Sequence, residues 1–338
     1  MVVLIGDKNS KRTEYFLKAA DKLDIPVHVT GWDDMFSGRG FCTLEGAVVK
    51  IDPPSYKITD LGIMQENLLI YQDILKKIAL CKCRFLNTPE AILNVLDKRA
   101  AKEKLVKYGI PVTDMLFSDV SSASGLIDFM KENKEYSVFI KPVNYSGAAG
   151  VAAFRINPVS GRMKLYTSCR LVDGRLYNTK KLYAIDNDTE VKSIIDKLAG
   201  ICREAGMPGL IAERWHPKDS FNGRSYDLRV VFQYGRVRHI VVRQSDGPVT
   251  NLHLNNNAMD FKALKLPVGI VESISETCMN AAGVFKGLNV CGIDVMLDRG
   301  SRRPRVIEIN GQGDLIYQDI FSENKIYTEQ VNMLSGKA

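Results

Sequence analysis

Gly292-Ile293-Asp294-Val295-Met296-Leu297 and Val306-Ile307-Glu308-Ile309-Asn310 are two apolar stretches that each carry acidic or amide oxygens. Both stretches predict β-strands, and Asp298-Arg299-Gly300-Ser301 between them predicts the turn of a hairpin. Side chains alternate along a strand, so Glu308 and Asn310 share one face. If the strands pair, Asp294 reaches that face too, and three oxygen-bearing side chains come together.

Carboxylate and amide oxygens are typical ligands of a hard cation, and magnesium favours such a set when it also holds substrate phosphates. The hairpin by itself is also consistent with an acid and an amide on the wet face of a sheet. The metal interpretation gains weight because the rest of the chain supplies phosphate-binding parts in a matching order.

Composition restricts the class of protein. The chain of 338 residues suffices for two or three domains. No apolar run approaches the ~20 residues that cross a bilayer. The opening residues predict a strand rather than a leader peptide, and the seven scattered cysteines do not suggest a disulfide framework. We therefore expect a cytoplasmic protein with reduced thiols and no membrane partner.

The net charge of +7 is spread along the chain, without a long basic run or interleaved aromatic residues. This distribution does not favour a nucleic-acid partner. An anionic substrate or nucleotide accounts for it more simply.

The first 95 residues predict a doubly wound α/β domain. Residues 2–6 and 26–29 have strand character, and apolar spacing over 11–23 predicts a helix between them. The loop 6–10 lacks the three-glycine dinucleotide fingerprint, so no nicotinamide or flavin site is predicted. Thr88 and Pro89 predict the cap and first residue of a further helix.

From about residue 96 the pattern becomes α+β with antiparallel hairpins. A charged helix opens at Asp97-Lys98. A further helix is predicted at 189–205. Strands are predicted at 136–141, 151–155, 164–167, 209–213, 228–233, 237–243, 290–296 and 305–310.

Two parts of this region carry residues suited to binding phosphate or sugar groups. Lys141 ends a strand, and the small-residue run Ser146-Gly147-Ala148-Ala149-Gly150 follows. Such a loop lets backbone N–H groups approach phosphate oxygens, and the lysine adds a point charge. Asp227 and Arg229 share a strand face and suit ribose hydroxyls and phosphate. An ordinary hairpin turn and a cross-strand ion pair are the structural alternatives.

The order of these charged and polar residues along the chain resembles that of the ATP-grasp superfamily. The order is Lys98, Lys141 with its loop, Glu213, Asp227 with Arg229, and then Asp294, Glu308 and Asn310. The set is similar to glutathione synthetases, D-alanine–D-alanine ligases and the glutamate ligases of ribosomal protein tails. The resemblance covers about residues 87–318. It implies a Rossmann-like domain at 1–95 and a two-lobed ATP-grasp domain, with a small lobe at 96–208 and a C-terminal lobe at 209–334.

The resemblance also implies roles. Lys98 and Lys141 would contact the phosphates of ATP, and Ser146, Gly147 and Ala148 would fold over them. Glu213 and the backbone of Arg214 and His216 would recognise adenine, and Asp227 the ribose. Two magnesium ions would lie on Asp294, Glu308 and Asn310. The catalytic group would comprise Arg229, Arg243 and Asp314. Asp314 would orient an incoming cationic amine, or else cap the turn into Leu315.

The activity implied is an ATP- and magnesium-dependent carboxylate–amine ligase, or a carboxylate–nucleophile ligase, that acts through an acyl phosphate and releases ADP and phosphate. The alternatives are a small-molecule kinase on the same fold and a nucleotide-binding regulator without turnover. The partners expected are a small-molecule or peptide carboxylate and an amine or other nucleophile. The sequence leaves open whether the protein forms a homodimer.

Overall fold

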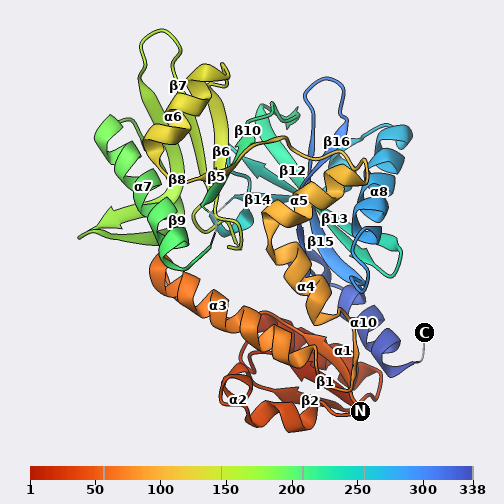
Figure 1. Ribbon diagram of the computed structural model, residues 1–338. Coiled ribbons are helices and arrows are strands. Elements are labelled where there is room, and N and C mark those ends of the chain that lie inside the picture. The colour runs from red at the N-terminus through yellow and green to blue at the C-terminus, as the bar shows by residue number, and fades with distance from the viewer. Residues whose placement is uncertain (56–57, 146, 208, 255, 337–338) are drawn as a thin grey trace.

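The computed structural model describes residues 1–55, 58–145, 147–207, 209–254 and 256–336. It is a mixed α/β protein with three sheets, one in each of three spatially separate regions (Figure 1). Within the described residues, no helix combines the length and the apolar character that crossing a membrane requires.

The N-terminal sheet is entirely parallel, with the strand order β2-β1-β3-β4. Its pairing agrees with the βαβ pattern predicted from residues 2–29, while the Rossmann-like designation stays a prediction. The elements are β1 (Val2–Ile5), α1 (Lys11–Lys22), β2 (Val27–Thr30), α2 (Trp32–Phe36), η1 (Arg39–Thr43), β3 (Val48–Ile51) and β4 (Arg84–Phe85).

Helix α3 (Leu61–Ile78) connects this region to the second sheet. The side chain of Asp60 caps the helix by accepting hydrogen bonds from the backbone N–H groups of Gly62 and Ile63. The same carboxylate lies 2.8 Å from Nε of Arg175 on β9. The start of α3 is therefore held by the second sheet, while its later residues pack in the N-terminal core.

Two short helices follow. α4 (Pro89–Leu96) begins after Thr88, whose hydroxyl accepts from the Ala91 N–H, so the predicted cap and first residue are confirmed. α5 (Lys98–Lys107) begins after the capping residue Asp97. The first lysine of the predicted site thus stands at the start of a helix.

The second sheet is antiparallel and has the order β5-β10-β6-β7-β8-β9. Helices α6 (Ala123–Glu132) and α7 (Asp188–Glu204) supply apolar side chains to its core. Its strands are β5 (Met115–Val120), β6 (Ser137–Lys141), β7 (Ala152–Ile156), β8 (Met163–Val172), β9 (Arg175–Ile185) and β10 (Leu210–Arg214).

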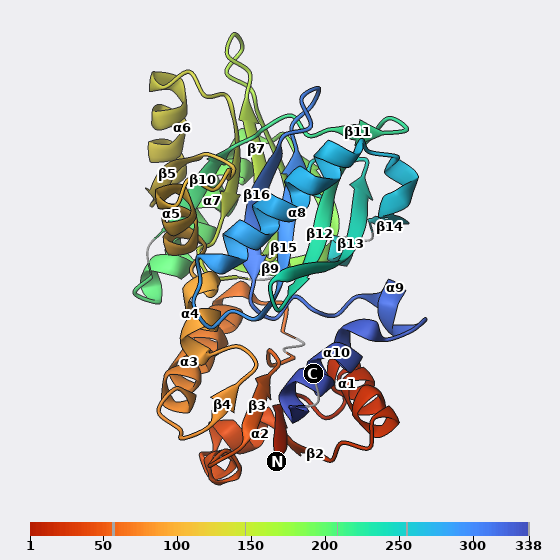
Figure 2. The same cartoon turned by 90° about the vertical axis from the view of Figure 1, so that its right-hand side faces the viewer.

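The third sheet has the order β14-β13-β12-β15-β16, and the short β11 pairs with β12. Helix α8 (Val268–Gly283) covers one face of it (Figure 2). The remaining elements are β11 (Ser220–Phe221), β12 (Arg224–Gln233), β13 (Arg236–Ser245), η2 (Leu252–Leu254), β14 (Asn257–Asp260), η3 (Phe261–Leu264), β15 (Val290–Leu297) and β16 (Pro304–Asn310).

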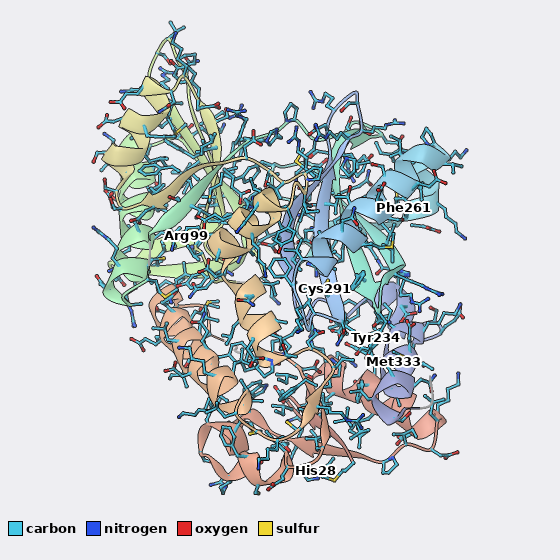
Figure 3. All side chains as sticks on the ribbon, turned by 45° about the vertical axis from the view of Figure 1, so that its right-hand side comes forward. His28, Arg99, Tyr234, Phe261, Cys291 and Met333 are labelled. Carbon is cyan, nitrogen blue, oxygen red and sulfur yellow. The ribbon has the colours of Figure 1, made fainter. Side chains whose placement is uncertain are left out.

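The C-terminal helices α9 (Tyr317–Ile320) and α10 (Lys325–Ser335) return to the N-terminal sheet. α10 lies against α1, and Tyr327 and Val331 share a core cluster with Phe16. Tyr234, from the turn between β12 and β13, packs against the same cluster (Figure 3). The domain boundaries stay a prediction, but α10, predicted as part of the C-terminal lobe, packs on the N-terminal domain.

Candidate functional site

The hairpin of β15 and β16 has the register that brings the predicted ligands together. Asp294 lies opposite Glu308, and Gly292 lies opposite Asn310. A bulge follows Asp294, so one extra residue is accommodated between Glu308 and Val306. The amide of Asn310 donates to Glu308 at 3.2 Å. Two carboxylates and one amide therefore occupy one end of this hairpin.

Two arginines of the neighbouring strands contact Asp294. Nε of Arg229 lies 2.6 Å from Oδ1, and Nη2 of Arg243 lies 3.2 Å from Oδ2. Nε of Arg243 also donates to Asp227 at 2.6 Å. Asp227 and Arg229 were predicted to suit ribose and phosphate, with a cross-strand ion pair as the structural alternative. Such a pair is present: Asp227 pairs with Arg243, which lies opposite it on the neighbouring strand β13.

The oxygen set suits a hard cation such as magnesium in its chemistry. Oδ1 of Asp294 is buried and has no hydrogen-bond partner, although Arg229 is close by. A cation that binds this oxygen would have to take the place of Arg229 beside it. The described residues contain no group of three or more His, Cys, Asp or Glu side chains arranged for a metal, so Asn310 has to complete the set. The number of ions stays a prediction.

The surroundings of Asp294 and Glu308 shift the pKa values of the two carboxyl groups in opposite directions. For Asp294, burial outweighs the two arginines and raises the pKa above its ordinary value. For Glu308, burial acts in the same direction, but Lys98 and Lys141 outweigh it and lower the pKa. Glu308 is thus held as the anion by the lysines predicted to contact phosphate.

Glu213 is fully enclosed between two lysines. Its Oε1 lies 2.6 Å from Nζ of Lys102, and its Oε2 accepts from Lys141 at 2.9 Å and from Thr113 at 2.8 Å. Burial favours the neutral acid, yet the two ammonium groups lower the pKa of Glu213 to about 2. Burial also lowers the pKa of Lys102 to about 8. Two cations share one carboxylate, which leaves a positive charge for an anionic ligand.

The segment after β6 has the backbone expected of a phosphate-covering loop. Gly147, Ala148 and Gly150 all have φ between 65° and 68°, a left-handed conformation that only glycine adopts without cost. Nζ of Lys98 donates to the carbonyl of Tyr145 in the same segment. Ser146, the first predicted residue of this loop, lies outside the described residues.

The predicted base and ribose positions border one cavity. Arg214 and His216 line it, and the N–H of His216 donates to the Arg214 carbonyl at 3.0 Å. An adenine that uses both groups has to replace this bond. Asp227 accepts from Thr250 and lies 3.5 Å from Lys218. Burial opposes its ionisation, but Arg243 and Lys218 lower the pKa of Asp227 to about 2.

Two adjoining cavities lie at the candidate site. The smaller, of about 90 Å³, borders Lys141, Glu213, Asp227 and Asp294. The larger, of about 600 Å³, extends from Asn310 toward the N-terminal sheet and α3. Lys98, Tyr145, Arg243, Asn251 and Glu308 line both. The smaller cavity has to widen to admit a nucleotide, and the larger one is open to a second ligand.

Arg229 reaches the larger cavity through a slot between Gly292 and Gly313. A Cβ placed on Gly292 would lie 2.5 Å from Nη1 of Arg229, and one on Gly313 would lie 2.7 Å from the same atom. Real Cβ atoms do not approach so closely. We call these two glycines the glycine slot. The guanidinium of Arg229 fits beside them because neither has a side chain, and a side chain at either position would displace it.

No protein-family model matches the chain, and no curated protein matches it. Solved structures match over nearly its whole length. One is the D-cycloserine synthetase DcsG, with a TM-score of 0.65, 13% identity, and 98% of this chain and 99% of that chain covered. Another is a RiPP-associated ATP-grasp ligase of Chryseobacterium gregarium, with a TM-score of 0.59, 12% identity, and coverage of 100% and 97%.

The chain has the ATP-grasp fold. The macrocyclase MdnC of Microcystis aeruginosa MRC also matches, with a TM-score of 0.60, 12% identity, and 99% of this chain and 100% of that chain covered. At these identities the likeness concerns the fold alone.

Within the ATP-grasp fold, Asp314 does not present a free carboxylate to an amine. Its side chain is buried, pairs with Arg12, accepts from Lys50 at 2.9 Å and accepts from Gln330 at 3.2 Å. Burial favours its neutral form, but Lys50 and Arg12 lower its pKa. The difference from the expectation arises because α1 packs beside Asp314. The charged side chain that lines the larger cavity there is therefore Arg12, and Asp314 itself does not line it. No described contact makes Asp314 a turn cap either.

Sequence reasoning missed Lys102, Lys218, Thr113, Thr250 and Arg12. One signal was available for Lys102, because it follows Lys98 by four residues on α5 and so shares its face. Lys218 and Thr250 lie in loops whose closeness depends on the third sheet. Arg12 lies on α1, beside the N-terminal sheet, and no spacing along the chain connects it to β16.

We expect the Glu213→Gln variant to lose about 3 kcal/mol of folding free energy at neutral pH, because two buried lysines lose their counter-charge. The pKa of Glu213 is lowered from 4.5 to about 2. Its stabilisation is therefore complete above about pH 4.5 and is lost as the pH falls through about 2. Urea unfolding at pH 7 and pH 3 should show the difference from wild type shrinking by roughly half.

The matched control is Glu103→Gln, which changes an exposed acid on the same helix as Lys102. This control should unfold like wild type at both pH values. An equal deficit for Glu213→Gln at pH 7 and pH 3 would contradict the assigned role of the carboxylate.

Proposed function

We propose that this protein is an ATP- and magnesium-dependent ligase that joins a carboxylate to an amine or another nucleophile and releases ADP and phosphate. The observation that carries the proposal is the oxygen face of Asp294, Glu308 and Asn310, which lies beside Lys98 and Arg243, two cations that line both cavities. Phosphoryl transfer depends mainly on positioning and on charges that offset the transferring group.

Each predicted nucleotide residue has a place in this proposal. Lys98 and Lys141 bind the phosphates, and the backbone of Gly147 and Ala148 covers them. Glu213, Arg214 and His216 form the adenine end of the smaller cavity, and Asp227 holds the ribose. Asp294, Glu308 and Asn310 would hold magnesium, which supplies charge neutralisation at the β- and γ-phosphates when bound.

The chemical steps use groups that face the shared end of the cavities. A substrate carboxylate in the larger cavity attacks the γ-phosphorus, the bond to the β-γ bridging oxygen breaks, and ADP leaves. The nucleophile then attacks the carbonyl carbon, and phosphate departs with loss of one proton from the amine. Arg229 and Arg243 donate to the negative oxygens in both steps. The loop after β6 excludes water that would hydrolyse the acyl phosphate.

The matching ligases support this class of substrate without defining it. The MdnC structure contains a precursor peptide, and the Chryseobacterium gregarium structure contains ADP with a leader and core peptide. We therefore include peptides and small molecules among the carboxylates and amines to be tested.

The test is to incubate the protein with ATP, magnesium and pooled acids and amines, and to measure ADP, phosphate and AMP. Release of ADP and phosphate that requires both an acid and an amine supports the ligase. ADP without free phosphate identifies a kinase, and AMP with pyrophosphate contradicts attack at the γ-phosphorus. Nucleotide binding without turnover on any pool identifies a regulator.

A further inference from the structure

The larger cavity is basic in its charged lining. Arg12, Lys98, Arg229 and Arg243 face it, whereas Glu308 is the only carboxylate among its described lining residues. Two of these cations belong to the nucleotide end, since Lys98 and Arg243 also line the smaller cavity. Arg12 and Arg229 line the larger cavity and not the smaller one. Each also pairs with an acid, Arg12 with Asp314 and Arg229 with Asp294, so a second ligand would use their remaining N–H donors.

Arg12 and Arg229 approach consecutive residues from two different domains. Arg12, in the first turn of α1, places Nη1 on the carboxylate of Asp314. Arg229, on β12, extends through the glycine slot and places Nη1 beside Gly313. The side chain of Arg12 is 21% exposed, and its guanidinium carries five N–H donors, of which the contacts with Asp314 and Tyr327 use only part. The convergence of two arginines suits a carboxylate.

The opposite wall of the cavity is apolar. Met64 and Leu68 are one turn apart on α3, and Ile92, Val95 and Leu96 come from α4, which packs on α3. Ile92 and Val95 are almost fully buried, so this wall is fixed by the core. Tyr71 and Gln312 close the end, where Tyr71 donates to Gln312 at 3.0 Å and Gln312 donates to the Ile51 carbonyl at 2.9 Å.

We propose that the larger cavity binds a carboxylic acid with an apolar body, whose carboxylate lies between Arg12 and Arg229 and whose body packs on α3 and α4. The inference rests on the proposed function only in calling this acid the substrate of the ligase. It reverses the charge expected from the sequence, because the side chain that lines the cavity here is Arg12, whose N–H donors favour a carboxylate over an ammonium group.

The experiment compares three probes on the full-length protein with magnesium and a non-hydrolysable ATP analogue. 4-Phenylbutyrate and 4-phenylbutylamine share a shape but carry opposite charges, and glutarate is an acid without an apolar body. By titration calorimetry, 4-phenylbutyrate should bind at least tenfold more tightly than either of the others. Equal binding of the amine, or no binding of 4-phenylbutyrate, overturns the proposal.

Variants then locate the site. The Arg12→Gln variant should bind 4-phenylbutyrate at least tenfold more weakly, while its affinity for the ATP analogue stays within twofold of wild type. Arg12→Lys keeps a positive charge beside Asp314 but lacks the planar fork, so an intermediate affinity is expected. Leu68→Asp should also weaken the binding of 4-phenylbutyrate, because it places a charge on the apolar wall. Arg39→Gln removes an exposed arginine that pairs with Asp34 in the same domain, and it serves as the control.

An unchanged affinity of 4-phenylbutyrate for Arg12→Gln overturns the proposal. If Arg12→Gln does not fold, Leu68→Asp and Arg12→Lys supply the same comparison. The readout is binding, so it separates this inference from the proposed function. Binding that depends on Arg12 without turnover on any pool would refute the ligase and keep the site, whereas turnover without any binding of 4-phenylbutyrate would keep the ligase and refute the site.

Discussion

Glu308→Gln should reduce turnover by about three orders of magnitude while the protein stays folded. Loss of one charged ligand removes several kcal/mol of stabilisation from the transferring phosphoryl group, and each tenfold corresponds to about 1.4 kcal/mol. The glutamine keeps an oxygen that accepts from Asn310, so the hairpin register is preserved. Steady-state release of ADP at saturating ATP and magnesium, with the substrates found by the pooled screen, measures the effect.

A second readout is independent of turnover. Binding of Mn²⁺ in the presence of a non-hydrolysable ATP analogue, followed by electron paramagnetic resonance, should weaken in the same variant. Glu272→Gln changes an exposed acid on α8 and is the matched control. Turnover within threefold of wild type, with normal Mn²⁺ binding, would remove Glu308 from the metal site.

Gly313→Ala should reduce kcat/KM by about a hundredfold, because a small displacement of a positioning group has that scale of effect. The added Cβ would lie 2.7 Å from Nη1 of Arg229 and 2.7 Å from Cα of Gly292. Both contacts are too short, so the guanidinium of Arg229 must move and the backbone between Gly292 and Gly313 must also shift. The loss should appear in the chemical step, while affinity for the ATP analogue is retained, since Gly313 does not line the smaller cavity.

Gly283→Ala provides the comparison. Gly283 ends α8 with no atom within 4 Å of an added Cβ, so alanine fits there without displacement. Its activity should equal wild type. If Gly313→Ala behaves in the same way as Gly283→Ala, the glycine slot does not position Arg229.

The hairpin of the candidate site could be predicted because its pattern is local. Alternation of period two sets which side chains share a face, and the turn residues set the pairing, so Asp294 and Glu308 lie opposite each other as expected. The resemblance in the order of charged residues likewise indicated the ATP-grasp fold, which the structural likeness supports.

Elements without a clean period were not predicted. β9 alternates poorly because it is an edge strand with both faces partly exposed, and β5 is the other edge of the same sheet. α8 carries two glycines and several β-branched residues, which weaken its helical signal. In each case packing in the finished domain overrides a weak local preference.

Charge pairing was harder to predict than strand pairing. Asp227 is two residues from Arg229 but pairs with Arg243 across the sheet. Asp314 appeared free in the sequence, although Lys50 binds it from 264 residues away. Such contacts depend on how domains pack, and spacing along the chain does not contain that information.

The packing of α10 on α1 has a consequence for biosynthesis. Arg12 and its partner Asp314 are separated by 302 residues, and Tyr15 accepts from Asn324 across 309 residues. Ribosomes add about 5–20 residues each second, so roughly 15–60 s elapse between synthesis of the two partners. During that interval the face of the first sheet that α10 will cover stays exposed. We expect the nascent chain to depend on a holding chaperone until α10 emerges.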